Sequence, residues 1–221
     1  MNVCQRSALA DPVRRTKKDS ERTRQQILAA ARKVFARQGV TRTTFEQIAR
    51  AARVTRGAIY WHFADKTELF YAMREQVSLP MIDRTDFALL RADAVDPIAG
   101  IGRFLRGVLD TLETDPATRQ TFQIMGFKCE YVGEMARELG QHASRLAELV
   151  AKLTEVYRRA ERAGKLRAGL RPAVAALDTS CFLIGLIRLW LLDKRGTLVR
   201  GAANTLINAH VAGRRRTGSS R

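Results

Sequence analysis

The stretch that decides the fold is TFEQIARAARVTRGAIYWHFADK, residues 44–66. Three helix-start signals follow one another in and around it. Hydroxyl and carboxylate side chains at these places can accept hydrogen bonds from the free N–H groups of a first helical turn. The predicted caps and helices are Thr43 with Glu46 for about 44–52, Thr55 for about 56–63, and Asp65 with Glu68 for a helix that ends near Leu79. Start signals at such short spacing predict a compact bundle of short helices.

The helix expected over 56–63 separates into two faces. Its core face should hold Ile59 and Phe63, four residues apart, with three apolar residues of the preceding helix, Phe45, Ile48 and Ala49. In a helix-turn-helix protein the opposite face enters the major groove of DNA, beginning with its N-terminal residues. The residues expected on that reading face are Thr55, Arg56, Gly57, Tyr60 and Trp61. Glycine allows the backbone to approach DNA closely, whereas the two aromatic rings could instead pack partly into the core.

Contacts with phosphates should supply much of the DNA affinity. Thr44 can offer its hydroxyl and backbone N–H, and Lys66 can offer its ammonium. Weaker candidates for the same role are Arg42, Arg53 and His62. The basic stretch over residues 14–24 suits a flexible arm along DNA, and it suits a solvated tail equally well.

The composition points to a polyanionic partner and excludes several classes of protein. The 221 residues carry a formal net charge of +17, which attracts polyanions such as nucleic acid. The three cysteines (Cys4, Cys129 and Cys181) lie far apart and form no CxxC pair, so we expect no disulfide framework, no metal and no cofactor. The three histidines are scattered and no phosphate-binding loop or nucleophile elbow occurs, which argues against an enzyme.

The rest of the chain predicts an all-α protein with a small head and a larger C-terminal domain. The expected domains are a disordered basic arm (1–19), a helix-turn-helix domain (20–66), an effector-binding and dimerisation domain (67–213) and a disordered basic tail (214–221). The first helix of the head is expected over about 20–38. Beyond the head, Asp96-Pro97 and Asp115-Pro116 should start helices over about 97–113 and 116–128, because each places a capping acid before a proline. Further helices are expected over about 132–163, 172–193 and 197–212, with 81–95 irregular or weakly helical. The apolar segment 172–192 contains Asp178 and Arg188, so we expect a buried helix, no membrane span and a cytoplasmic protein.

The segment from Thr23 to Phe70 resembles the DNA-binding domain of TetR-family repressors. The resemblance is strongest in GAIYWHF, residues 57–63, with Lys66 and Leu69-Phe70. It implies a homodimer that places its third helices in successive major grooves of a palindromic operator. It also implies a C-terminal domain that binds a small effector and then releases the DNA.

A second resemblance narrows the branch. The segment KCEYVGEM, residues 128–135, is similar to one in repressors of multidrug efflux operons of the acriflavine-resistance type. Members of that branch usually begin close to the equivalent of Arg14, so residues 1–12 are expected to be an upstream extension, with Val13 as an alternative start. Alternatives are a TetR-type regulator of another operon, an activator, and a non-specific basic DNA binder.

The C-terminal domain should hold both the dimer interface and the effector pocket. A helix that is apolar on every side must be covered on every side. We therefore expect helices 172–192 and 197–212 to pair with their copies through Val174, Leu177, Cys181, Ile184, Leu191 and Leu206. A pocket for a hydrophobic or amphipathic effector of undetermined charge is expected among Phe104, Phe122, Gln123, Met125, Cys129, Glu130, Phe182, Arg188 and Trp190.

Overall fold

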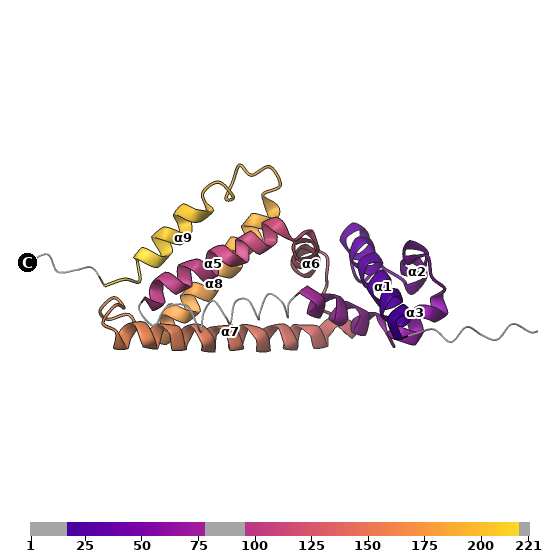
Figure 1. Cartoon of the computed structure of the whole chain (residues 1–221), viewed down its shortest axis with the longest axis horizontal. Helices are drawn as coiled ribbons and strands as arrows, with labels where there is room; N and C mark the ends of the chain where they lie inside the picture. The colour runs from indigo at the N-terminus through magenta and orange to yellow at the C-terminus, as the bar shows by residue number, and fades with distance from the viewer. Residues whose placement is uncertain (1–16, 78–95, 217–221) are drawn as a thin grey trace, which may run out of the picture.

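The computed structural model describes residues 17–77 and 96–216, and these residues form an all-α fold. The head contains α1 (Lys17–Gln38), α2 (Phe45–Ala52) and α3 (Arg56–His62), followed by a helix over residues 66–77 that we call the 66–77 helix. The body contains α5 (Pro97–Thr114), α6 (Pro116–Phe127), the 3-10 turn η1 (Gly133–Met135), α7 (Ala136–Arg162), α8 (Pro172–Leu192) and α9 (Ala203–Ala212). Figure 1 shows α6 between α1 of the head and the adjoining end of α5, with the long α7 running below the body. The all-α fold is confirmed.

The helix starts in the head follow local capping, with one correction. Thr44, not Thr43, caps α2: its Oγ1 accepts from the Gln47 N–H at 3.3 Å while its own N–H donates to Gln47 Oε1 at 2.9 Å. The Thr43 hydroxyl is instead buried and donates to the Gly39 carbonyl at 2.6 Å. The predicted cap Thr55 is confirmed by its bond from the Ala58 N–H at 3.2 Å.

Two further sets of predicted caps are confirmed. The Glu68 N–H donates to Asp65 Oδ1 at 2.7 Å, which confirms the cap, and the Glu68 carboxylate accepts from the N–H of Ala64, the residue before the cap, at 2.7 Å. Asp96 and Asp115 cap α5 and α6, and each precedes a proline at the first helical position. The expected end of the 66–77 helix near Leu79 and the segment 81–95 lie outside the described residues.

The head and the body have separate cores that share one boundary. The head core gathers α1, α2, α3 and the 66–77 helix around Phe35, Ile48 and Ile59, and it also contains Ile124 of α6 and Met135 of η1. The body core gathers α5, α7, α8 and α9. Because two body residues are buried inside the head core, the head cannot move without α6 and η1.

A buried ion pair makes a second connection between head and body. Arg74 of the 66–77 helix is 1% exposed, and its guanidinium lies 2.7 Å from Glu138 Oε2 of α7. The same guanidinium donates to Gln141 at 2.7 Å. Arg145 pairs with Glu75 beside it. Breaking such a pair strands a buried charge, so the contact fixes the 66–77 helix to α7.

α8 is the one helix among the described residues that is long and apolar enough to span a membrane by length and composition. Within the body it packs mainly against α7, and Ala175, Leu183 and Leu186 are nearly inaccessible to solvent. Its apolar composition is that of a core helix with one side left open, as the exposed positions below show.

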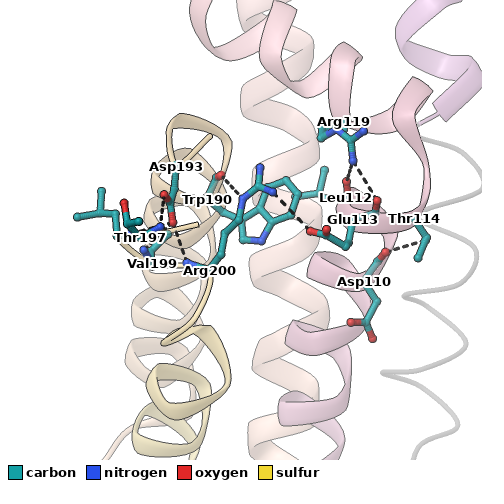
Figure 2. A network of polar contacts seen from close by, with 11 residues as sticks. Asp110, Leu112, Glu113, Thr114, Arg119, Trp190, Asp193, Thr197, Val199 and Arg200 are labelled. Carbon is teal, nitrogen blue, oxygen red and sulfur yellow. Dashed lines mark hydrogen bonds and ion pairs between the residues drawn. The ribbon is translucent and has the colours of Figure 1, made fainter. Parts of the chain in front are cut away.

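The start of the last helix differs from the prediction because Asp193 organises the preceding turn. The carboxylate of Asp193 accepts backbone N–H groups from residues 197, 198, 199 and 200 at 2.9–3.1 Å (Figure 2). The Arg200 guanidinium lies 3.9 Å from the centre of the Trp190 ring and 3.7 Å from Glu113. These contacts hold residues 193–202 in a turn, so α9 begins at Ala203 rather than near 197.

Both described ends of the chain are more ordered than expected. α1 begins at Lys17, so residues 17–19 are helical; residues 1–16 lie outside the described residues. At the other end, Arg214 pairs with Asp178, and Arg215 pairs with Asp96 at 2.8 Å. Backbone bonds of 2.9 Å join Arg167 N to Arg214 O and Arg216 N to Lys165 O. The basic tail is therefore held in place through residue 216, and 217–221 lie outside the described residues.

We expect Asp193→Asn to lower the midpoint of thermal unfolding near neutral pH by about 3–6 °C, because an amide nitrogen would face backbone donors. The four N–H groups lower the pKa of Asp193 to about 2, below the unfolded value of about 3.9. The charge-dependent stabilisation is therefore complete above about pH 5 and is lost as the pH falls toward 2, with about half left at pH 3.

The measurement is the difference in unfolding midpoint between wild type and variant from pH 7 to pH 3. Asp110→Asn is the matched control, because this exposed aspartate on α5 gives its backbone carbonyl, not its carboxylate, to the Thr114 hydroxyl. A difference for Asp193→Asn that stays constant down to pH 3 would contradict the assignment of the carboxylate as the centre of the turn.

Candidate nucleic-acid interface and effector cavity

α3 presents two aromatic rings and an arginine to solvent. Trp61 is 74% exposed and Tyr60 is 49% exposed, so core packing does not account for either ring. Tyr60 rests edge-on against Phe45, with ring centroids 5.1 Å apart. Arg56 donates to the Tyr60 hydroxyl at 3.1 Å and lies over its ring. The docking residues Ile59 and Phe63 are buried on the opposite side, as predicted.

Gly57 occupies an open position on this face. A β-carbon added at Gly57 would meet no heavy atom within 4 Å, and its backbone φ is not positive. Glycine inside a helix costs about 0.5–1 kcal/mol relative to alanine. Neither packing nor backbone conformation within the described chain requires glycine here, and the open position allows a partner to approach the backbone closely.

A surface hollow adjoins the N-terminal end of α3. It is lined by Ser20, Arg53, Val54, Thr55, Gly57, Ala58 and Trp61. No acidic residue is among them. The hollow therefore brings three of the sequence-predicted reading residues to one place on the head, beside a cation and a serine of α1.

Three of the predicted phosphate-binding side chains are also engaged inside the head. The Lys66 ammonium donates to the carbonyls of Thr41 and Thr43 at 2.9 and 3.3 Å. Arg42 Nε donates to the Gln38 carbonyl at 3.0 Å, and the Thr44 hydroxyl caps α2. These contacts fix the connection between α1 and α2, a structural role that the sequence did not indicate. His62 contacts the Trp61 ring edge-on, with centroids 4.9 Å apart.

The body contains a half-open cavity of about 400 Å³ beside the head. Its walls come from α6, α7, α8 and the segment that follows α6. The lining residues are Phe122, Met125, Gly126, Phe127, Cys129, Tyr131, His142, Ile184, Ile187, Arg188 and Leu191. An apolar cavity of this size with a few polar groups is typical of a small-molecule site.

Four of the nine residues predicted for the pocket line this cavity: Phe122, Met125, Cys129 and Arg188. Phe104 and Trp190 are instead buried in the body core, at about 3% exposure. Phe182 stacks on His210, with ring centroids 4.0 Å apart, and belongs to the α8–α9 contact. Gln123 and Glu130 are not among the lining residues, and Glu130 is exposed.

The sequence prediction missed the remaining lining residues for identifiable reasons. The sequence predicts Ile184 and Leu191 at the dimer interface rather than in the pocket, yet both line the cavity. Leu191 is only 4% exposed within its own chain. Tyr131 lies within the 128–135 motif and Phe127 directly precedes it, so the motif could have indicated both residues. His142 lies on α7, and nothing in the local pattern joins it to α6; only the fold brings the two helices together.

The cavity has a cationic side and no carboxylate among its lining residues. Arg188 lies 4.9 Å from the centre of the Phe127 ring, and the Tyr131 hydroxyl donates to the Met125 carbonyl at 3.0 Å. Burial raises the pKa of the Cys129 thiol to about 11, so this thiol is protonated at neutral pH. Partial removal from water, then the charges of Arg74 and Arg145, lower the pKa of His142, which keeps the imidazole neutral there.

An apolar stripe remains exposed along α8 and α9. It comprises Val174, Leu177, Cys181 and Ile184 of α8 with Leu206 of α9. Leu177 alone is 55% exposed. Five of the six predicted interface positions are therefore accessible in the single chain. Among the described residues, no group of histidine, cysteine or acidic side chains is placed to hold a metal ion.

Comparisons with known proteins agree with this arrangement. Residues 27–73 match the family described as bacterial regulatory proteins, tetR family, and residues 96–213 match the C-terminal region of MAATS-type transcriptional repressors. The regulator TtgR of Pseudomonas putida is 39% identical over 184 residues, covering 81% of this chain and 85% of TtgR. AcrR of Shigella flexneri is 35% identical over 178 residues, covering 80% and 82%.

Solved structures of efflux-pump repressors share the whole fold. NalD, the secondary repressor of the MexAB-OprM multidrug efflux pump in Pseudomonas aeruginosa, superposes with a TM-score of 0.80 at 32% identity, covering 90% of this chain and 99% of NalD. The SmeT–triclosan complex gives 0.76 at 27% identity, covering 89% and 93%. With a helix-turn-helix head and a cavity-bearing body, the chain is a ligand-responsive DNA-binding repressor that belongs to the TetR family of bacterial regulatory proteins.

Proposed function

We propose that this repressor controls a multidrug efflux operon, which it binds as a cytoplasmic homodimer at a palindromic operator and leaves when a small molecule fills the α6–α8 cavity. The observation that carries the proposal is that α6 is shared between the cavity wall and the head core. The similarity to NalD and to SmeT, the repressor of the Stenotrophomonas maltophilia pump SmeDEF, supports the efflux target.

In this proposal α3 reads base edges and the surrounding elements bind phosphates. Thr55, Arg56, Gly57, Tyr60 and Trp61 face the major groove. Their exposure, together with the open space at Gly57, supports this assignment. Phosphates are bound by the exposed Thr44 and Arg42 and by His62. Lys66 also contributes, through the third N–H of its ammonium, because the other two donate to backbone carbonyls.

The coupling between cavity and head runs through α6. Phe122 and Met125 face the cavity, whereas Ile124 between them is fully buried in the head core. Arg32 of α1 donates to the Thr121 hydroxyl of α6 at 3.2 Å, and Val40 N–H donates to the Lys128 carbonyl at 2.9 Å. A ligand that displaces α6 must therefore displace α1, and with it the α2–α3 pair. Only a ligand with different affinities for the two positions of α6 can cause release.

The dimer follows from the exposed stripe on α8 and α9. Two symmetric half-sites in DNA require a two-fold protein, and a two-fold interface pairs the same patch on both subunits. Val174, Leu177, Cys181 and Ile184 recur along one side of α8 at helical spacing. Pairing α8 and α9 with their copies forms a four-helix interface that buries this stripe.

The cavity chemistry favours neutral or anionic aromatic effectors. The lining residues that the structure describes offer aromatic rings, a methionine and one arginine, and none of them is a carboxylate that could balance a cationic drug. Transfer of a cation into such a site would be unfavourable, because the cation would lose its hydration without gaining a contact with an opposite charge. A phenol or an aromatic acid can stack on Phe127 and meet Arg188.

We expect Tyr60→Ala to weaken specific operator binding by about 10-fold or more per dimer, because a half-exposed ring of the reading face is removed. Circular dichroism and sedimentation should show the wild-type fold and mass. The measurement is fluorescence anisotropy with a duplex selected by the protein from random DNA. Tyr71→Ala, an exposed tyrosine of the 66–77 helix, should keep near-wild-type affinity. Equal affinity of Tyr60→Ala and wild type would exclude Tyr60 from the interface.

We expect Leu177→Arg to give a monomer, because two buried arginines would oppose each other across the two-fold interface. Analytical ultracentrifugation should show half the wild-type mass, and specific operator affinity should fall by about 100-fold or more as half-sites are bound singly. Leu139→Arg is the control, since Leu139 on α7 is similarly exposed but lies outside the stripe. A dimeric Leu177→Arg protein would place the interface elsewhere.

We expect Arg188→Met to lower the affinity for the anionic dye 1-anilinonaphthalene-8-sulfonate by about 10-fold, because the cation facing its sulfonate is lost. The affinity for the cation ethidium should stay equal or rise. Dye fluorescence and operator release measure both. Arg195→Met, in the α8–α9 turn and outside the cavity lining, should change neither. Unchanged dye affinity in Arg188→Met would refute the charge assignment of the cavity.

A further inference from the structure

Arg53 has a backbone conformation that, among the described residues, only glycines share. It caps the C-terminus of α2 with φ 55° and ψ 42°, in the left-handed region. Six described residues have positive φ, and the other five are Gly39, Gly133, Gly164, Gly169 and Gly196. A side chain in this region places its β-carbon against the following carbonyl, which glycine avoids. The arginine is therefore retained at a cost to the stability of the turn.

The turn itself does not need the arginine side chain. The Arg53 N–H donates to the carbonyls of Ala49 and Arg50, the latter at 3.3 Å, and the Val54 N–H donates to the Ala49 carbonyl at 3.0 Å. A glycine at position 53 would donate its N–H equally well and leave the bond from Val54 unchanged. Whatever favours arginine at this position must therefore involve the side chain.

The Arg53 side chain is exposed and has no hydrogen bond, ion pair or ring contact with any residue that the structure describes. Its neighbours differ in this respect. Arg50 pairs with Glu46 at 3.5 Å, and Arg56 is held by Tyr60. The Arg53 side chain instead borders the hollow that also contains Thr55, Gly57 and Trp61.

We propose that Arg53 is a DNA-binding residue whose guanidinium grips a backbone phosphate at the edge of the major groove that α3 enters. The fork of a guanidinium matches a phosphate with two hydrogen bonds, and this contact compensates the strain of the turn only when DNA is bound. Among the described residues, the lining of the hollow includes no acidic side chain that would compete for the cation. The inference rests on the proposed operator binding and adds to it the residue that joins α2 to α3.

Two substitutions separate the charge from the strain. Arg53→Gly removes the guanidinium and relieves the left-handed turn, whereas Arg53→Ala removes the guanidinium and keeps the β-carbon. We expect both to lower affinity for the selected duplex by about 10-fold per dimer. Both should also reduce the slope of log affinity against log salt by about 2, one phosphate for each subunit. The unfolding midpoint of Arg53→Gly should exceed that of Arg53→Ala by about 2–4 °C.

The matched control is Lys33→Ala, which removes one positive charge from an exposed position of α1. This position lies about 20 Å along the helix from Ser20 at the hollow, given the rise per residue of an α-helix. It should leave the salt slope near the wild-type value. Arg53→Lys should retain most of the slope but part of the affinity, because an ammonium is a point charge.

The outcomes distinguish this inference from the proposed function. If the wild-type protein shows no preference for the selected duplex over a scrambled one, the operator proposal fails and this inference with it. If wild type prefers the selected duplex while Arg53→Ala keeps the same affinity and slope, the role of Arg53 alone is overturned. A loss of affinity in Arg53→Gly but not in Arg53→Ala would show that turn geometry matters and would likewise reject the phosphate contact.

Discussion

The burial of Ile59 and Phe63 is the contact on which the function of this protein depends. α3 has seven residues, too few for a helix to be stable alone in water. It persists because these two side chains are almost inaccessible among residues of α1, α2 and the 66–77 helix. Because Ile59 and Phe63 bury one face of α3 against the head core, the opposite face, with Tyr60 and Trp61, remains exposed to solvent. Any shift of that core redirects the reading face as a whole.

The head core is in turn completed by the body. Ile124 and Met135 come from beyond residue 96 in sequence, yet they are buried with the helices of the head. This arrangement explains why a cavity in the body can matter to α3 without touching it. It also explains why the 128–135 motif, which the sequence related to efflux repressors, lies beside both the cavity and the head: Cys129 lines the first and Met135 enters the second.

Helix starts were predictable because caps act over three or four residues. Thr55, Asp65, Asp96 and Asp115 were all correct caps, and Thr43 for Thr44 shifted a boundary by a single position. The larger error was at α9, where no capping residue marks the start and the helix begins at Ala203 rather than near 197. The cavity was predicted less well because its walls depend on which helix faces meet. From the sequence alone, Phe104, Trp190 and Arg188 were equally plausible pocket residues. The packing of the body places Phe104 and Trp190 in the buried core and Arg188 in the cavity lining. Asp193 was missed because its partners are backbone groups, which carry no sequence signal.

The body is attached to the head by two different kinds of contact. One is the buried ion pair of Arg74 and Glu138, which is costly to break. The other is α6, which borders a cavity and therefore has space to shift. If the protein binds its operator as the proposed two-fold dimer, the distance between its two α3 helices must match one helical repeat of DNA, about 34–36 Å, for both half-sites to be bound together. A ligand that shifted α6 while Arg74 stayed paired with Glu138 would tilt each head about that ion pair and change this distance. Release from DNA would then depend on the spacing of the two α3 helices.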